Sequence, residues 1–409
     1  MFRRPFCHFS RQLLLSAFIF LLSASSWAAS TKVIYSFAGD EDGEYPDTDL
    51  VLDKAGNIYG TTVLGGDFGS GTVFMLSRSG NGWSHTVLYD FTSGKDGGQP
   101  YKGVTLDAQG NLYGTTVTGG TGSCEGGCGV AYKLTNSSGV WTQTVLHSFT
   151  GGNDGSGPGN ALTIDPAGNL FGMTPIGGAF GLGTIYQLHP RSDGSYAFRV
   201  IHQFAGGIEG SSASAGRLLL DQTGNLYGVT TVGGIHESGM AFELVRSPQG
   251  FQYKDLYNFH GVPESGFPYS ALVRDSTGHL YGTTYYAGAN NLGSVYELTY
   301  HAGIWQQDLL YSFTAGIDAN SPIGNLVVGS TGKLYGASSE GGTATVGTIF
   351  QLSRDGNGQW TESVVYNFQG SPDAALPYDG MVGDGQGNYY GATVRGGVAD
   401  EGAIYQFTP

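Results

Sequence analysis

Short apolar runs, separated by glycine-rich and polar turns, recur along the whole chain about every 55 residues, a period typical of repeat architectures. The clearest run reads Gly-Asn-Leu-Tyr-Gly-Thr-Thr. It occurs seven times with variation, at Gly56–Thr62, Gly110–Thr116, Gly168–Thr174, Gly224–Thr230, Gly278–Thr284, Gly332–Ser338 and Gly387–Thr393.

Each repeat contains four strand signals. In the second repeat they cover Gly103–Leu106, Asn111–Thr116, Gly129–Leu134 and Trp141–Phe149, which we call strands A, B, C and D. Between strands A and B the chain reads Asp-x-x-Gly-Asn, as at Asp107. This pattern predicts a tight hairpin turn, because Asp accepts hydrogen bonds from the backbone amides that follow it and Gly adopts a positive φ.

The aromatic residues and the chain ends predict how the repeats assemble. Strands B, C and D each carry an aromatic residue that can pack between neighbouring sheets. The first strand signal after residue 28 is a D-type strand, Val33–Phe37, and the last is a C-type strand, Gly402–Phe407. We therefore predict an all-β, seven-bladed β-propeller with four strands per blade, closed by the N-terminal strand in the last blade. An open solenoid is the alternative, but it would expose the aromatic faces of both end repeats.

The N-terminal segment has the pattern of a signal peptide. Arg3, Arg4 and Arg11 precede an apolar run, Leu13–Leu22, and small residues flank Trp27 where a signal peptidase would cleave. The alternative, a membrane anchor, would need an apolar run of about 20 residues. We expect residues 1–28 to be removed on export to the periplasm or the cell exterior, which leaves residues 29–409 as the propeller.

Charge narrows the classes of partner. The chain has 18 basic and 33 acidic residues, and removal of the signal peptide takes away three arginines and leaves a net charge near −18. Such a surface repels nucleic acid and anionic membranes. It is compatible with neutral glycans, cations and basic proteins.

The repeat phrase, followed by a glycine doublet and a strand such as Gly71–Leu76, resembles the GloVer tandem repeat of exported bacterial proteins. The resemblance covers essentially all of the predicted mature chain. It implies an exported repeat protein and no particular activity. Two weaker likenesses, to Kelch and NHL propellers, concern the fold only.

The loops that join strand D to the next strand A carry an acidic residue five positions after the strand D phenylalanine. These acids are Asp42, Asp96, Asp154, Glu209, Glu264, Asp318 and Asp373. In six of these loops a proline follows four residues later, at Pro46, Pro100, Pro158, Pro268, Pro322 and Pro377. In an up-and-down meander the D–A and B–C loops share one face, so we expect a ring of carboxylates around the mouth of a central channel. Each carboxylate would cap its own loop; the alternative is a shared Ca²⁺ site, since Ca²⁺ takes six to eight oxygen ligands.

Departures from the repeat are candidates for specific chemistry. An insertion in the second B–C loop brings Cys124 and Cys128 together, and we expect a disulfide in an exported protein. Arg274 stands in strand A where most repeats have an aliphatic residue, so it either pairs with a neighbouring carboxylate or orients an anionic ligand in the channel. His147, His202 and His236 have no metal-site spacing, and we interpret them as ordinary substitutions.

The repeats contain no recognisable catalytic motif. We therefore expect an exported, non-catalytic, monomeric protein whose B–C and D–A loop face recognises a glycan or a protein partner, with no cofactor other than, in the alternative above, Ca²⁺. Two other functions stay open at this stage. One is a metal-assisted hydrolase or polysaccharide lyase that uses the acids and Arg274 at the channel mouth, and the other is a structural surface protein.

Overall fold

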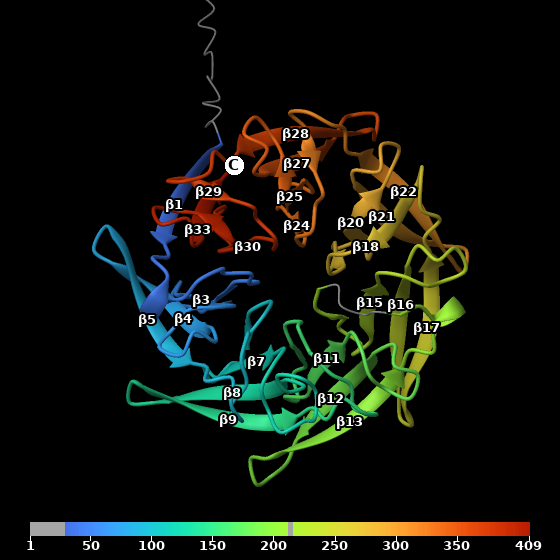
Figure 1. Ribbon diagram of the computed structural model, residues 1–409. Helices are drawn as coiled ribbons and strands as arrows, with labels where there is room; N and C mark the ends of the chain where they lie inside the picture. The colour runs from blue at the N-terminus through green and yellow to red at the C-terminus, as the bar shows by residue number, and fades with distance from the viewer. Residues whose placement is uncertain (1–28, 212–215) are drawn as a thin grey trace, which may run out of the picture.

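The computed structural model describes residues 29–211 and 216–409, and the expected signal peptide lies outside the described residues. Seven antiparallel sheets, each built on a four-strand meander, stand around a central axis as the blades of a propeller (Figure 1). This arrangement confirms the predicted fold. Each blade runs from a short inner strand A to a long outer strand D.

In every blade the four strands lie in the order A, B, C, D from the axis outwards. Blade 1 has β2 (Val51–Leu52), β3 (Ile58–Thr62), β4 (Thr72–Ser79) and β5 (Gly82–Asp90); blade 2 has β6 (Val104–Leu106), β7 (Leu112–Thr116), β8 (Val130–Ser137) and β9 (Val140–Ser148). Blade 3 has β10 (Thr163–Ile164), β11 (Leu170–Thr174), β12 (Thr184–Pro190) and β13 (Tyr196–Gln203); blade 4 has β14 (Leu219–Leu220), β15 (Leu226–Thr230), β16 (Met240–Ser247) and β17 (Gly250–Asn258). Blade 5 has β19 (Val273–Arg274), β20 (Leu280–Ala287), β21 (Ser294–His301) and β22 (Ile304–Ser312); blade 6 has β24 (Val327–Val328), β25 (Leu334–Ser338), β27 (Thr348–Arg354) and β28 (Trp360–Asn367). Blade 7 has β30 (Val382–Gly383), β31 (Tyr389–Thr393), β33 (Ala403–Thr408) and β1 (Ser30–Ser36).

The last blade is completed by the first strand of the chain. β1 pairs antiparallel with β33, so that Ser30 lies opposite Thr408 and Ser36 opposite Ala403. Backbone hydrogen bonds between the two ends of the chain therefore close the ring, as the sequence predicts. Without this pairing β33 would present an open strand edge.

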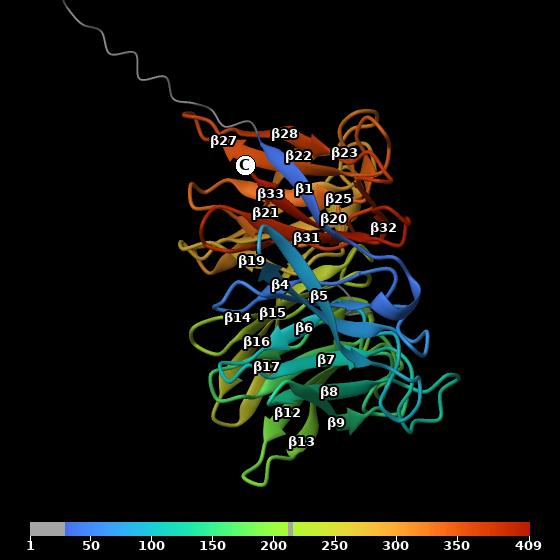
Figure 2. The ribbon, with the colours of Figure 1, turned by 90° about the vertical axis from the view of Figure 1, so that its left-hand side faces the viewer.

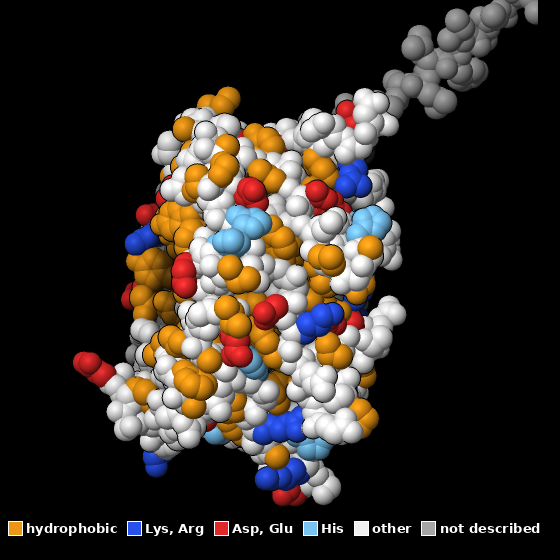
Figure 3. All heavy atoms as spheres, turned by 90° about the vertical axis from the view of Figure 1, so that its right-hand side faces the viewer, with side chains coloured by type: hydrophobic (Ala, Val, Ile, Leu, Met, Phe, Trp, Pro, Cys, Tyr) orange, Lys and Arg blue, Asp and Glu red, His pale blue; other side chains and the backbone are white. Residues whose placement is uncertain are grey.

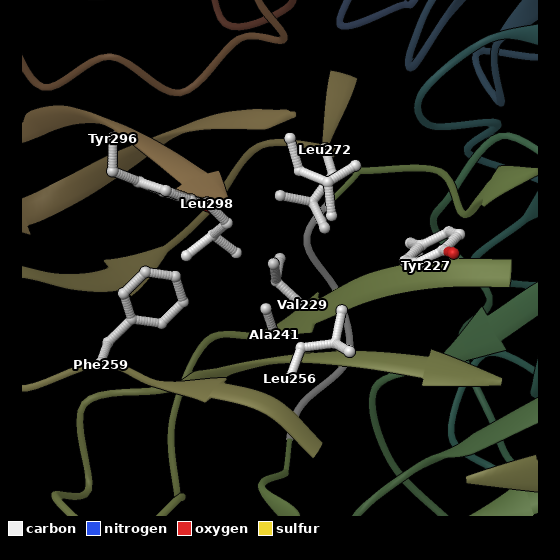
Figure 4. Packing of buried hydrophobic residues seen from close by; sticks show 9 residues of the cluster. Tyr227, Val229, Ala241, Leu256, Phe259, Leu272, Tyr296 and Leu298 are labelled. Atoms are coloured by element: carbon white, nitrogen blue, oxygen red, sulfur yellow. The ribbon is translucent and has the colours of Figure 1, made fainter. Parts of the chain in front are cut away.

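One aromatic contact is repeated at all seven blade interfaces. The phenylalanine that follows each strand D is fully buried and meets, edge to face, the strand C aromatic residue of the next blade, with ring centroids 4.8–5.7 Å apart. Aliphatic side chains fill the space around these pairs; between blades 4 and 5, Val229 and Leu256 pack towards Leu272 and Leu298 (Figure 4). Each aromatic pair contributes about 0.5–1.5 kcal/mol beyond its buried area.

The fixed glycine in the middle of the repeat phrase is required by the same packing. A Cβ atom on Gly114 of β7 would lie 2.3 Å from the phenol oxygen of Tyr132 on β8. The strand C ring therefore covers strand B only because strand B has no side chain there. The predicted A–B turns are present as well: Asp53 Oδ1 accepts the backbone N–H groups of Ala55 and Asn57 at 2.8 and 2.9 Å.

The two faces of the disc, seen edge-on in Figure 2, differ in construction. On one face, D–A loops pair with B–C loops through short extra strands: β18 (Ser265–Pro268) with β20, β23 (Ala319–Asn320) with β26 (Glu340–Gly341), and β29 (Ala374–Ala375) with β32 (Arg395–Gly396). Two of the D–A loops also contain a 3-10 turn, η1 (Asp40–Asp42) and η2 (Gly207–Glu209). We call this side the D–A/B–C face, and the opposite side, with the hairpin turns, the A–B/C–D face.

Candidate functional site

Five of the seven predicted acids cap their own D–A loops. Asp42 accepts the backbone N–H of Ala38 at 3.0 Å and the phenol O–H of Tyr35 at 2.7 Å. The same two kinds of contact, to a backbone N–H four residues earlier and to a strand D side chain seven residues earlier, are made by Asp96, Asp154, Asp318 and Asp373. The carboxylates thus fix the path of the chain from one blade to the next.

The two glutamates at this position behave differently. The backbone carbonyl of Glu209 accepts the phenol O–H of Tyr253 at 3.0 Å. The carboxylate of Glu264 meets the side chain of His260, with Oε2 2.8 Å from Nδ1. Glu264 thus contacts the side chain of the residue four positions earlier, whereas the aspartates accept the backbone N–H of that residue.

The structure does not place the acids around the channel. Their hydrogen-bond partners lie on or just after strands such as β1 and β5, which form the outer side of the disc (Figure 1), so the carboxylates are held towards the outer strands. The expectation of a carboxylate ring at the channel mouth is wrong, because the strand D side chains hold the acids outwards. Among residues 29–211 and 216–409, no group of three or more His, Cys, Asp or Glu side chains is arranged to hold a metal ion.

Arg274 lies at the other end of the blade from these acids. It is the last residue of the short strand β19, next to the A–B turn, and its Nη1 is 3.5 Å from Asp221 Oδ2 of blade 4. Its guanidinium also lies 5.7 Å from the ring centroid of Tyr227. The pairing alternative is therefore the one found, and Arg274 does not join the acids on the D–A/B–C face.

Cys124 and Cys128 form a disulfide within the B–C loop of blade 2. Cys128 is fully buried. Cys124 Sγ lies 3.3 Å from Ser156 Oγ in the following D–A loop. The bridge thus ties the enlarged loop to its neighbour on the D–A/B–C face.

A cup at the axis of the D–A/B–C face was not anticipated from the sequence. It has a volume of about 670 Å³ and is lined by the residue that directly follows each of the six loop prolines: Asp47, Tyr101, Gly159, Tyr269, Ile323 and Tyr378. Tyr285 and Tyr286, at the end of β20, complete its aromatic wall. The volume falls within the range usual for small-molecule sites.

The tyrosines of the cup offer both ring faces and hydroxyl groups. Tyr269 and Tyr286 are 39% and 48% exposed. Tyr285 lies between them, with ring centroids 5.9 Å from Tyr269 and 4.4 Å from Tyr286. Burial raises the pKa of Tyr101 and of Tyr285, so both phenols stay protonated and can donate hydrogen bonds at neutral pH.

A buried charge network forms part of the floor of the cup. Lys102 of blade 2 pairs with Asp47 of blade 1 and, at 2.8 Å, with Oδ1 of Asp379 of blade 7. Burial opposes the charge of Lys102, but the two carboxylates outweigh it and raise the lysine pKa. Burial and the nearby carboxylates raise the pKa of Asp379, whereas Lys102 outweighs burial and lowers that of Asp47.

Below this floor a second set of polar side chains crosses the channel. Asn325 of blade 6 donates to both oxygens of Asp49 of blade 1, at 3.0 and 3.2 Å, and Arg217 of blade 4 lies 3.5 Å from the same carboxylate. The rest of the channel beneath them is a cavity of about 450 Å³ lined mainly by the aliphatic side chains of the inner strands. The polar residues at the start of strand A thus separate the cup from the channel.

The sequence does contain a signal for the cup. The residue after the loop proline varies between repeats, with a tyrosine in blades 2, 5 and 7. Blade 5 alone has two further tyrosines, Tyr285 and Tyr286, where blade 1 has Val63 and Leu64. Non-consensus residues at the inner end of the loops mark the site. The acids, which recur in every repeat, mark the scaffold.

Comparison with protein families agrees with the repeat pattern. A model of the Gloeobacter/Verrucomicrobia repeat matches residues 17–242, 121–275 and 215–409. The chain belongs to this family. The resemblance to the GloVer repeat is thereby confirmed, and no curated protein matches the sequence.

Solved structures with a similar fold are distant in sequence. One, described as the extracellular domain of a hybrid two-component system from B. thetaiotaomicron, is 11% identical with a TM-score of 0.59, over 92% of this chain and 39% of that chain. A protein from Lactobacillus plantarum is 14% identical with a TM-score of 0.53, over 86% and 99% of the two chains. A gluconolactonase from Xanthomonas campestris is 12% identical with a TM-score of 0.41, over 74% and 82%. At these identities the likeness concerns the fold alone.

Within the part of the chain that the structure describes, no helix has the length and apolar character needed to cross a bilayer.

Proposed function

We propose that this protein is an exported binding propeller that recognises a neutral saccharide in the tyrosine cup of its D–A/B–C face. In this proposal residues 1–28 direct export, and residues 29–409 act as a monomer. The observation that carries it is the convergence of five tyrosines, Tyr101, Tyr269, Tyr285, Tyr286 and Tyr378, on one cavity at the axis.

Aromatic rings in a cup suit the chemistry of sugars. A pyranose has an apolar face of C–H groups that stacks on an aromatic ring, and hydroxyls around its edge that need hydrogen-bond partners. Tyr269 and Tyr286 supply partly exposed rings. The phenol groups and Gln99 supply donors and acceptors around the same cavity.

The charges of the cup favour a neutral ligand. Among the described residues that line the cup there is one cation, Lys102, and it is compensated by Asp47 and Asp379. The whole chain has a formal charge of −15, which disfavours anionic ligands. The hydrolase or lyase alternative required the acids and Arg274 in one place, and these residues lie on opposite faces of the disc, so we do not extend the proposal to it.

The test uses residues 29–409 on an array of neutral and charged glycans, followed by calorimetric titration of the best neutral ligand. Replacing Tyr269 and Tyr286 together by Ala is expected to weaken binding at least tenfold. The matched control is Tyr300→Ala, which removes a 55% exposed tyrosine at the A–B/C–D end of β21 and should leave binding unchanged. Absence of any neutral ligand, or equal affinity of the double variant and the parent, would overturn the proposal.

A further inference from the structure

Two histidines from different loops meet at the edge of the D–A/B–C face. His236 comes from the B–C loop of blade 4, between β15 and β16, and His260 from the D–A loop that follows β17. Their ring centroids are 4.4 Å apart, and the side chain of His260 is 46% exposed. A patch of neighbouring histidine side chains, close to acidic ones, is visible on this side of the molecule (Figure 3).

The pair is a departure from the repeat in both loops. Blades 1, 3, 6 and 7 have Phe68, Phe180, Ala344 and Ala399 where blade 4 has His236. After the strand D phenylalanine, other blades have Ala, Thr or Gln where His260 stands. A functional group that occurs once in seven repeats is not required by the propeller itself.

A carboxylate behind His260 fixes the orientation of its imidazole. Glu264 Oε2 lies 2.8 Å from Nδ1, and the phenol oxygen of Tyr257 is 3.2 Å from the same nitrogen. When Nδ1–H donates to the carboxylate, the lone pair of the ring is on Nε2, the nitrogen that is free to bind a metal ion. Metal-binding histidines almost always donate their second N–H to a carboxylate, a backbone carbonyl or a water, and a carboxylate partner also makes the ligand more basic.

From this geometry we infer that His236 and His260 bind one divalent transition-metal ion of the zinc type, with Glu264 as a positioning residue. Imidazole nitrogens suit Zn²⁺, Cu²⁺ and Ni²⁺, whereas Ca²⁺ and Mg²⁺ take oxygen ligands. The site supplies two protein ligands, and water completes the coordination. Because Glu264 is held on the far nitrogen of His260, it supports a ligand and is not counted as a third one.

The test is calorimetric titration of residues 29–409 with Zn²⁺ after removal of metal by a chelator. We expect one ion per chain, and His236→Gln or His260→Gln to lower the affinity at least tenfold. Glu264→Gln is expected to lower it about 10-fold to 100-fold, since outer-shell partners have effects of this size. His301→Gln is the control, because His301 is exposed at the end of β21 on the opposite face.

The variants remove exposed side chains, and equal melting temperatures without metal will show that they fold. No saturable Zn²⁺ binding, or equal affinity of the parent and both histidine variants, would overturn the inference. A site that binds Ca²⁺ as tightly as Zn²⁺ would also overturn it. The outcome is independent of the tyrosine cup, whose ligand can be titrated in the same variants.

Discussion

The ring of Tyr35 stacks on the imidazole of His85, with centroids 4.5 Å apart and planes 10° from parallel. Tyr35 belongs to β1 of blade 7 and His85 to β5 of blade 1, so the contact lies on the outer side of the seam where the ring closes. The same arrangement joins His147 to Phe198 at 3.8 Å and His202 to Tyr253 at 4.1 Å. Three of the seven blade interfaces thus contain an imidazole stacked on another aromatic ring.

These histidines should make the protein sensitive to acid. Burial lowers the pKa of His85 and of His202 to about 4, below the value near 6.5 expected in the unfolded chain. Between these values the unfolded chain binds more protons, so stability is complete above pH 6.5 and falls as the pH decreases towards 4. We predict a fall of the unfolding free energy over this range, of about 1–2 kcal/mol per histidine after allowing for partial exposure.

The histidine contribution can be isolated with His85→Gln, because Gln143 and Gln307 occupy the equivalent position in blades 2 and 5. Urea unfolding at pH 7.5, 5.5 and 4.5 should show a smaller acid effect in this variant than in the parent or in the exposed control His301→Gln. If all three proteins lose the same stability, the acid sensitivity comes from other groups.

A half-buried acid at another blade interface should make stability depend on pH in the opposite direction. Burial, and next the charge of Asp318, raise the pKa of Glu362 to about 8. The native state therefore binds more protons than the unfolded chain between pH 4.5 and 8, and stability falls as the pH rises through this window. We predict that Glu362→Gln stabilises the protein at pH 8 by about 1–2 kcal/mol, after allowing for the partial exposure of the side chain.

The repeat itself supports this substitution. Gln143, at the same position of blade 2, donates from Nε2 to the backbone carbonyl of Asp96 at 2.9 Å. A glutamine at 362 can make the same bond to the carbonyl of residue 318. Chemical unfolding at pH 5 and pH 8 is the measurement. A gain that does not grow with pH would show that Glu362 is not held in its protonated form.

The parts of the fold that recur were predictable, because they depend on spacing along the chain. The position of β1 beside β33 follows from the repeat pattern, because the first strand signal is D-type and the last one, in the seventh repeat, lacks a D-type partner. The role of Asp53 follows from the turn pattern around it. In each case the interacting residues belong to the same repeat or to strand types that pair within every other blade.

The cup was not predictable in the same way, since Lys102 and Asp379 are far apart in sequence and meet only at the axis. The sequence places the acids in the correct loops. It does not show that they lie near the outer strands and not at the mouth of the channel. The loop position of Asp42 does not reveal that Tyr35 on the outer strand holds its carboxylate. The place of Arg274 directly before the turn at Asp275 does indicate the A–B end, but it does not reveal its partner, Asp221 of the neighbouring blade.

The loop acids should contribute to stability and not to calcium binding. Asp96 accepts hydrogen bonds from Tyr89 and from the backbone and side chain of Thr92, so its loss leaves a loop N–H without its acceptor. By analogy with other side-chain caps, Asp96→Ala should cost about 0.5–2 kcal/mol. Glu264→Ala, which removes no such cap, is the matched control for thermal unfolding.

The effect of calcium on thermal stability distinguishes the capping role of the acids from a cation-binding role. A ligand that binds only the native state raises the melting temperature by mass action. We expect melting curves of the metal-free protein with excess Ca²⁺ and with a calcium-selective chelator to coincide. A chelator-induced fall that disappears in Asp96→Ala and Asp154→Ala, but persists in Asp318→Ala, would contradict the capping role.

The closure of the ring gives the last prediction. Removal of residues 29–37 deletes β1 and Phe37, which leaves the edge of β33 unpaired and removes a fully buried ring that packs edge-on against Phe74. Exposed strand edges pair with other chains, so the truncated protein should form oligomers and melt at a lower temperature than residues 29–409. Light scattering and calorimetry will measure both effects.

A synthetic peptide of residues 29–37 should restore the monomer. A peptide with Phe37 and Tyr35 replaced by Ala should restore it poorly, because it keeps the backbone pairing but lacks the rings that pack at the interface between blades 7 and 1. Equal melting temperatures for the truncated and complete chains would mean that the remaining strands close the propeller without β1.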